Sequence, residues 1–187
     1  MTQPKYVVGV GASAGGLDSL KRLVSTIPDG STGLAFVIVQ HLNPDHRSLM
    51  VELLQRESSV PVMAIEDGLE IEPDHVYIAP AGWLTTLEEG VFHLEKIGPG
   101  EHNRHPVDAF LVSIASDMGA RSIGVVLSGS GDDGMMGINS IALAGGVTFA
   151  QDLNSAQFNG MPRSAISSGV IDYIMPPDSM VSAILRL

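Results

Sequence analysis

Short runs of apolar and β-branched residues alternate along the chain with segments in which apolar residues recur every third or fourth position. The runs predict β-strands, and the helical spacing between them predicts amphipathic helices. The expected strands are Tyr6–Val10, Leu34–Gln40, Val76–Pro80, Ile123–Leu127, Val147–Ala150 and Val170–Ile174. The expected helices carry the apolar sets Leu20/Leu23/Val24/Ile27, Leu49/Met50/Leu53/Leu54 and Val107/Phe110/Leu111/Ile114, with three more near Met135–Ala144, from Pro162 and from Pro177.

The middle of the chain departs from this alternation. Trp83–Leu87 and Val91–Leu94 flank Glu88-Glu89-Gly90, which predicts a β-hairpin. Ile97–His105 is polar and contains glycine and proline, which predicts a mobile loop.

Strand–helix alternation implies an α/β fold: a doubly wound, mostly parallel sheet with helices on both faces, in a three-layer sandwich. The chain has 187 residues and shows no internal repeat or interdomain linker, so a single domain over residues 1–187 is expected. In such sheets ligands bind beyond the carboxyl ends of the strands, and candidate chemistry is expected there.

Composition narrows the classes of function. A hydrophobic fraction of 44% argues against disorder, and a formal net charge of −11 argues against nucleic-acid binding, which needs clustered Lys and Arg. The absence of cysteine excludes disulfides, thiolate metal sites and a cysteine nucleophile. No signal-peptide pattern is present, and no apolar stretch approaches the roughly 20 residues of a membrane span. We therefore expect a cytoplasmic protein without membrane insertion.

Gly11-Ala12-Ser13-Ala14-Gly15 matches the pattern G-x-S-x-G between an expected strand and an expected helix. A sharp strand-to-helix turn exposes such a serine above the sheet edge, and small neighbours permit the tight backbone. Ser13 is therefore a candidate nucleophile, and the N–H of Ala14 would point to where an oxyanion forms. The alternative is a glycine-rich turn in which the serine caps the helix.

A serine nucleophile needs a base. His41 directly follows the expected strand Leu34–Gln40, so it lies at a strand's carboxyl end and is favoured over the other histidines. His46 lies farther into the same loop. The remaining histidines fall in irregular or edge segments: His75, His93, His102 and His105.

The base in turn needs a carboxylate on its other ring nitrogen. Asp132 and Asp133 follow Ile123–Leu127 through Ser128-Gly129-Ser130-Gly131, at a third carboxyl end. One aspartate could cap the next helix instead, and both interpretations can hold, one for each residue. The order Ser…His…Asp differs from the Ser…Asp…His of α/β-hydrolases and disfavours that family, although triads are defined by geometry.

Six blocks, in order and covering nearly the whole chain, resemble the chemotaxis receptor protein-glutamate methylesterase family. They read VVGVGASAGGLDSL, VIVQHLNPDHRSLM, DHVYIAPAG, HPVDAFLVSIA, IGVVLSGSGDDGMMGI and AQDLNSAQFNGMPRSAI. The resemblance implies Ser13 as nucleophile, His41 as base and Asp133 as the orienting carboxylate, with a further oxyanion-hole N–H from Ser130. It implies a serine esterase that hydrolyses glutamate methyl esters on chemoreceptor-type proteins and releases methanol, and it also allows glutamine deamidation.

Asp132 is a departure, because that position is usually not acidic in the family. Many members carry an N-terminal receiver domain of a phosphorelay, whose phosphorylation relieves inhibition. This sequence starts at the esterase's first strand, so we expect that control to be absent from it. The motifs G-A-S-A-G-G and H-L-x-P-x-H resemble those of the subgroup that is fused to a receptor methyltransferase. The expected partners are thus a methylated chemoreceptor or other sensory protein, and a methyltransferase or sensor domain in a longer chain.

Gly160-Met161-Pro162-Arg163 belongs to the last block. Proline at the first helical position is an ordinary helix start. The functional alternative is that Met161 and Arg163 line the substrate cleft, with Arg163 meeting an acidic receptor surface, as Arg47 and Arg104 would from neighbouring loops. The loops expected at the rim of the cleft are Asn43–Ser48, Ile97–His105 and Asn159–Arg163.

Other classes of function fit the residues less well. Gly9-x-Gly11-x-x-x-Gly15 resembles a dinucleotide loop, but Gln40-His41 stand where the ribose-binding acid belongs, and no G-K-[ST] is present. A non-catalytic signalling or binding module on the same fold is the main alternative, although all three triad residues are present. No H-E-x-x-H or similar cluster occurs, so neither a metal nor a cofactor is expected.

Overall fold

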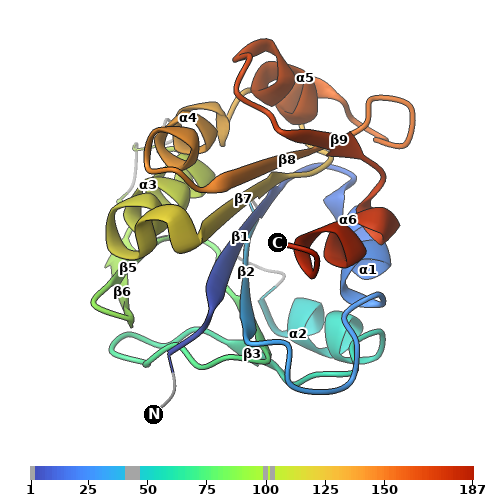
Figure 1. Ribbon diagram of the computed structural model, residues 1–187. Coiled ribbons are helices and arrows are strands. Elements are labelled where there is room, and N and C mark those ends of the chain that lie inside the picture. The colour runs from blue at the N-terminus through green and yellow to red at the C-terminus, as the bar shows by residue number, and fades with distance from the viewer. Residues whose placement is uncertain (1–2, 41–46, 99–100, 102–103) are drawn as a thin grey trace.

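The computed structural model describes residues 3–40, 47–98, 101 and 104–187. In this part of the chain, a seven-stranded sheet runs through the centre with helices on both faces (Figure 1). The strand order is β3-β4-β2-β1-β7-β8-β9, and every neighbouring pair is parallel. The strands are β1 (Tyr6–Ala12), β2 (Leu34–Gln40), β3 (Val62–Ala64), β4 (His75–Ile78), β7 (Ser122–Val126), β8 (Val147–Gln151) and β9 (Tyr173–Met175). The predicted doubly wound α/β fold is confirmed.

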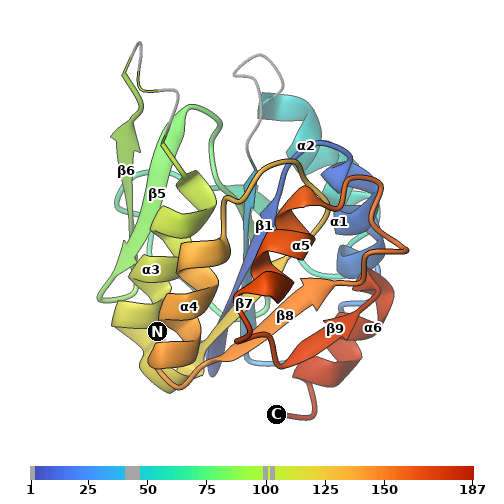
Figure 2. The same cartoon turned by 90° about the horizontal axis from the view of Figure 1, so that it is seen from above.

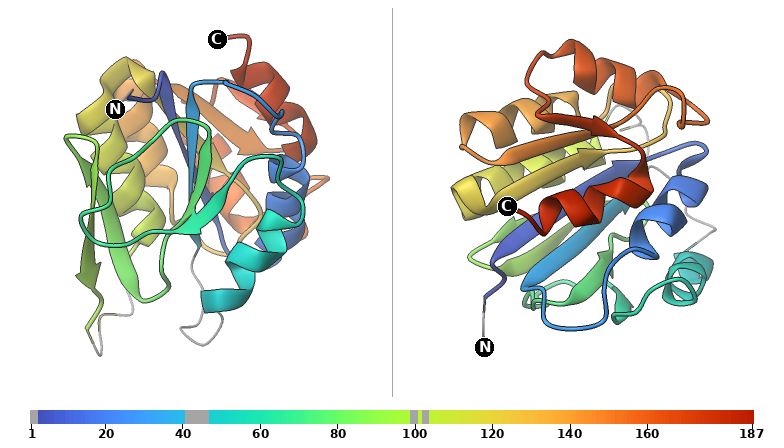
Figure 3. Two further views of the ribbon diagram at one scale, coloured as in Figure 1. Left: turned by 90° about the horizontal axis from the view of Figure 1, so that it is seen from below. Right: turned by 45° about the vertical axis from the view of Figure 1, so that its right-hand side comes forward.

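Helices cover both faces of this sheet (Figures 2 and 3), and each face carries a hydrophobic core of its own. One face is covered by α1 (Gly16–Val24), α2 (Arg47–Gln55) and α6 (Pro177–Ile184). The other is covered by α3 (Pro106–Met118), α4 (Met135–Leu143) and α5 (Gly160–Ser167), with a 3₁₀ turn, η2 (Gly119–Arg121), after α3. No helix in the described part of the chain has the length and apolar character to cross a membrane.

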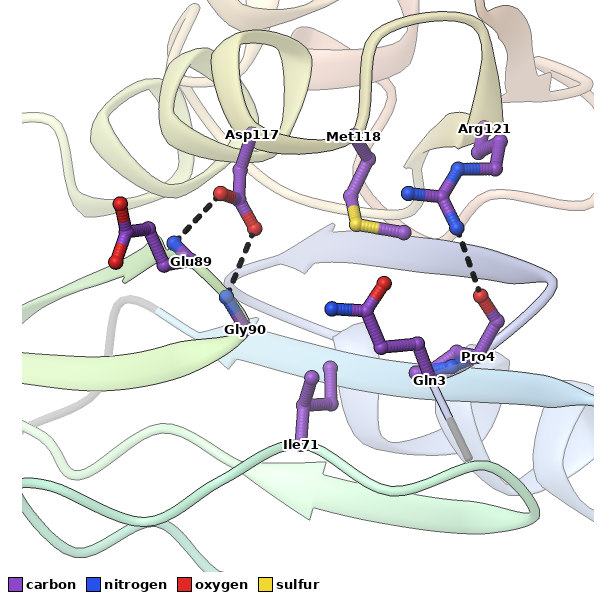
Figure 4. A pocket seen from close by; sticks show the side chains of 8 residues that line it. All are labelled: Gln3, Pro4, Ile71, Glu89, Gly90, Asp117, Met118 and Arg121. Carbon is purple, nitrogen blue, oxygen red and sulfur yellow. Dashed lines mark hydrogen bonds between the residues drawn. The ribbon is translucent and has the colours of Figure 1, made fainter. Parts of the chain in front are cut away.

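The predicted hairpin is present and lies outside α3, as an antiparallel pair of β5 (Trp83–Glu88) and β6 (Val91–Lys96). Its turn has positive φ at Glu89 (51°) and Gly90 (76°). The Asp117 carboxylate at the end of α3 accepts both turn N–H groups, at 2.6 Å and 3.2 Å, so helix and hairpin are fixed to one another (Figure 4).

Several elements differ from the predictions by one or more residues, and α5, β3 and β9 are among them. Helix α5 begins at Gly160, not Pro162, and the three-residue β3 is too short to leave a pattern. Strand β9 begins at Tyr173, where a strand from Val170 was predicted. Asp172 explains the shift: its carboxylate accepts the Thr148 N–H at 2.9 Å, so Val170 and Ile171 pack on the core from a loop and pairing starts one residue later.

The strand order reverses between β1 and β7. Strand β2 pairs with one edge of β1, and the chain later returns so that β7 pairs with the other edge of β1. Ligand sites in open α/β sheets lie at such switch points, beyond the carboxyl ends of the strands. The loops after β1 and β7 are therefore the place for chemistry in this fold.

Helices α3 and α4 approach closely at Gly137. A Cβ at this position would lie 2.4 Å from the Cβ of Leu111 and 2.9 Å from its Cδ1. The backbone of α4 thus rests directly on the α3 side chain, and the separation of the two helices is set by the missing side chain.

Replacing Gly137 with alanine is expected to lower the free energy of unfolding by about 2 kcal/mol, measured by urea denaturation. Overpacking costs about 1–3 kcal/mol, which exceeds the roughly 1 kcal/mol that alanine gains in helix propensity. Ser140→Ala on the same helix, whose hydroxyl bonds only to the Met136 carbonyl of its own helix, is the control and should change stability little. A more stable Gly137→Ala protein would show that the helices separate at no cost.

Candidate active site

Ser13 lies in a tight turn between β1 and α1. Gly15 is the N-cap of α1, with a left-handed φ of 68° that glycine readily adopts, and no side chain caps this helix. The Ser13 N–H donates to the Ser128 carbonyl at 3.0 Å, and its carbonyl accepts the Gly16 N–H at 2.9 Å. The alternative in which this serine caps the helix is therefore excluded, and its backbone is fixed to the loop after β7.

The loop after β7 is held between the Ser13 turn and the start of α5. The Gly129 N–H donates to the Phe158 carbonyl, and the Gly129 carbonyl accepts the Met161 N–H, both at 2.9 Å. A Cβ at Gly129 would lie 2.2 Å from the Met161 Sδ and 2.9 Å from the Ser13 Cβ. Gly129 is therefore required for the nucleophile turn and α5 to close on this loop.

The two predicted oxyanion-hole residues lie on these joined loops. Ala14 and Ser130 are both exposed. Within the part of the chain that the structure describes, neither of their N–H groups donates to another residue. Unengaged N–H groups on the Ser13 turn and on the loop after β7 are available to an oxyanion, and the assignment of Ala14 and Ser130 stays a prediction.

The two aspartates after β7 occupy different surroundings. Asp133 is 7% exposed and accepts the N–H groups of Val107 at 3.1 Å and Asp108 at 2.9 Å. Asp132 is exposed. A carboxylate held by two backbone donors is suited to orient a base, whereas the Asp132 carboxylate is exposed to solvent. This difference supports Asp133 over Asp132 as the orienting residue, which remains a prediction.

The base His41 lies outside the described residues, as do His46 and His102. The structure does place His105, which sequence reasoning set aside, close to the candidate site. Its Nδ1 lies 3.8 Å from Asp133 Oδ1 and 3.7 Å from Asp108 Oδ2, and its side chain is 48% exposed. His105 is the N-cap residue of α3, and the first turn of this helix bonds to Asp133 from about 25 residues away in the sequence, a contact that no local pattern signals.

Asp108 is the residue that sequence reasoning missed. It is 8% exposed, and its Oδ1 accepts the N–H groups of Gly134 at 2.9 Å and Gly137 at 2.8 Å. Burial raises the pKa of the Asp108 carboxyl and the nearby Asp133 charge adds to this, while the Gly137 and Gly134 N–H groups oppose it. Ligand-type atoms of His105, Asp108 and Asp133 lie within 4.8 Å of one another, but both carboxylates are already bound by backbone N–H groups.

A groove of about 270 Å³ opens beside Ser13, between the nucleophile turn and α2. Its lining is mainly apolar and includes Ser13, Leu17, Gln40, Leu49, Met50 and Leu53. A second cavity, of about 60 Å³, lies at the amino ends of the strands, between Gln3, Ile71 and Met118 (Figure 4). It is far too small for a protein side chain with its ester, so the groove at Ser13 is the substrate-sized hollow of the two.

The predicted substrate contacts divide into buried and exposed residues. Met161 is 1% exposed and packs beneath Gly129, so it supports the loop from below. Arg163 is exposed on α5. Arg104 pairs with Glu95 at 3.0 Å and Glu101 at 3.3 Å, so its charge is already balanced within the chain. The side chain of Arg47 lies outside the described residues.

Fold and site together define the class: a doubly wound α/β protein with a half-buried serine in a tight turn and a buried aspartate on the adjoining loop at the switch point. A family model described as CheB methylesterase matches residues 8–184. The chain belongs to the CheB methylesterase family.

Several known proteins are similar over most of this chain. The Thermotoga maritima CheB methylesterase catalytic domain, solved by crystallography, superposes with a TM-score of 0.89 at 31% identity and covers 99% of both chains. A protein-glutamate methylesterase/protein-glutamine glutaminase of Geobacter sulfurreducens is 36% identical over 96% of this chain and 49% of its own length. Its counterpart in Pyrococcus abyssi is 32% identical over 97% and 50%. The chain thus spans about half the length of these curated relatives.

Proposed function

We propose that this chain is the catalytic unit of a serine esterase that hydrolyses glutamate methyl esters on chemoreceptor-type proteins, with Ser13, His41 and Asp133 as its triad. The observation that carries the proposal is the position of Ser13. Its backbone is anchored to the Ser128 carbonyl, its side chain does not cap α1, and it lines the apolar groove of about 270 Å³. The family and the named methylesterase relatives support the same reaction.

In the proposed mechanism Ser13 Oγ attacks the ester carbonyl carbon while His41 takes its proton. The tetrahedral oxyanion accepts the N–H groups of Ala14 and Ser130, whose bonds strengthen as charge develops. The C–O bond to the methoxy group then breaks, His41 returns the proton, and methanol leaves an acyl-enzyme. Water, deprotonated by His41, attacks this ester and releases glutamate and Ser13. Asp133 orients His41 and stabilises its imidazolium.

Deamidation of glutamine is the proposed second reaction, because the same steps release ammonia when the leaving group is an amine. The named relatives are described as both methylesterase and glutaminase. The proposed partners are a methylated chemoreceptor and further domains of a longer chain, such as a methyltransferase or sensor domain. The proposed place of action is the cytoplasm, where the receptor's methylated helices would be met.

The test is methanol release from a methylated chemoreceptor incubated with the purified chain, with its unmethylated form as blank. Release by the chain, together with deamidation of receptor glutamines, would support the esterase. Tight receptor binding without release would favour the non-catalytic module. A melting temperature raised by NAD or ATP, without ester turnover, would favour the nucleotide-binding alternative.

Replacing Arg163 with glutamine is expected to raise KM for methylated receptor about two- to five-fold at low salt, because exposed charge pairs contribute up to about 1 kcal/mol. The difference should vanish above about 0.1 M salt, where the screening length is near 10 Å. Hydrolysis of 4-nitrophenyl acetate should be unchanged. Arg186→Gln, at the exposed C-terminal end, is the matched control. Equal losses on both substrates would mean that Arg163 shapes the catalytic site.

A further inference from the structure

Helices α3 and α4 begin side by side, and the N-terminus of each helix is capped by a carboxylate that lies at or just before the start of the other helix. Asp133, two residues before α4, accepts the Val107 and Asp108 N–H groups in the first turn of α3. Asp108, in that first turn, accepts the Gly134 and Gly137 N–H groups at the start of α4. Negative groups are stabilised at helix N-termini, where the backbone donors are unsatisfied and the dipole is positive.

These four hydrogen bonds replace the local caps that both helices lack. The N-cap residues His105 and Gly134 supply no side-chain cap bond to their own helices. Gly134, directly after Asp133, has a left-handed φ of 104°, and its N–H is held by Asp108. Asp108 therefore fixes the backbone at Gly134, the residue after Asp133, and its own N–H binds the Asp133 carboxylate.

Charge couples the two residues as well. Both are buried, at 7% and 8% exposure; burial raises the pKa of Asp108, and the negative charge of Asp133 raises it further. His105 is within 4 Å of both carboxylates. Asp108 thus acts on the same few atoms that the proposed mechanism uses to orient the base, without lining the groove at Ser13 itself.

We propose that Asp108 is a positioning residue for Asp133: by exchanging backbone hydrogen bonds between α3 and α4, it holds the Asp133 carboxylate in the orientation that the histidine base needs. This inference rests on the proposed esterase function. Asp108 does not line the groove at Ser13, so its loss should act on turnover through Asp133.

Removing Asp108 as Asp108→Ala leaves the Gly134 and Gly137 N–H groups without their acceptor and should lower kcat about 10²-fold, the effect of a displacement near 1 Å. KM should change less than about two-fold, because the groove at Ser13 is untouched. Asp108→Asn retains an oxygen that can accept both N–H groups and should recover most of kcat. The measurement is methanol release from methylated chemoreceptor at a temperature where every variant is folded.

Asp117→Ala is the matched control. Asp117 also accepts two backbone N–H groups, those of Glu89 and Gly90, but at the opposite end of α3 (Figure 4). Its removal should lower stability and leave kcat unchanged. A similar kcat loss in Asp117→Ala and Asp108→Ala would overturn the inference, because general loosening of α3 would then explain both.

A double-mutant cycle separates positioning from a structural role. In an Asp133→Asn background Asp108→Ala should cost little further kcat, since the group through which it acts is already disabled. A full additional 10²-fold loss would overturn the inference. Wild-type turnover together with its loss in Ser13→Ala tests the esterase proposal independently.

Hydrogen exchange at Val107 offers a readout without turnover. Its N–H, bound by Asp133, should lose protection in Asp108→Ala, and unchanged protection would likewise overturn the inference.

Discussion

Replacing Ser13 with alanine is expected to lower kcat for methyl-ester hydrolysis by about 10⁴-fold or more, the loss seen when a triad nucleophile is removed. The residual rate should be that of a site which still binds and polarises the ester, because the N–H groups of Ala14 and Ser130 belong to the backbone. The binding constant for methylated receptor should change little, since the substitution deletes one oxygen at the edge of the groove. The measurement is methanol release together with receptor binding.

Ser182→Ala is the control for this experiment. Ser182 is exposed on α6 and its hydroxyl bonds to the Ser179 carbonyl of its own helix. It should leave both turnover and binding unchanged. A Ser13→Ala protein that keeps more than a tenth of the wild-type kcat would contradict a serine mechanism and leave His41 or His105 acting on water as the alternative.

The pattern of apolar residues in the sequence predicted those elements of the fold that are apolar on both faces or strongly periodic. Leu34–Gln40 was predicted with its observed bounds, because six of its positions are buried between two helical layers and leave a continuous apolar run. β3 left no such signal, because it has three residues and only Val62 is buried. The start of β9 was wrong because a single hydrogen-bonding residue, Asp172, interrupts pairing within an otherwise apolar run.

The site divides in the same way. Ser13 could be found because a local pattern, strand–turn–helix with small neighbours, is itself the physical requirement for an exposed serine. Asp108 could not, because an aspartate in the first turn of a helix is ordinary, and its partners Gly134 and Gly137 lie more than twenty residues away. Spacing along one helix gives no information on which other helix start lies beside it.

Asp133→Asn is expected to lower kcat by about 10⁴-fold, because a neutral amide favours the wrong histidine tautomer and cannot stabilise the imidazolium. The structure adds a second effect that the sequence did not predict. The two carboxylate oxygens accept the N–H groups of Asp108 and Val107 separately, and an amide has only one acceptor oxygen. One backbone donor is then left facing an NH₂ group, which should lower the free energy of unfolding by about 1–3 kcal/mol.

Asp132→Asn is the matched control, one residue away and exposed. It should change kcat by less than about two-fold and leave the urea midpoint unchanged, because its carboxylate accepts no hydrogen bond among the described residues. Both variants replace one carboxylate oxygen with an NH₂ group, so comparing them isolates the effect of the burial and hydrogen bonding of Asp133. If Asp132→Asn were the more damaging change to kcat, the orienting role would pass to Asp132, and Asp133 would be a helix cap for α3 alone.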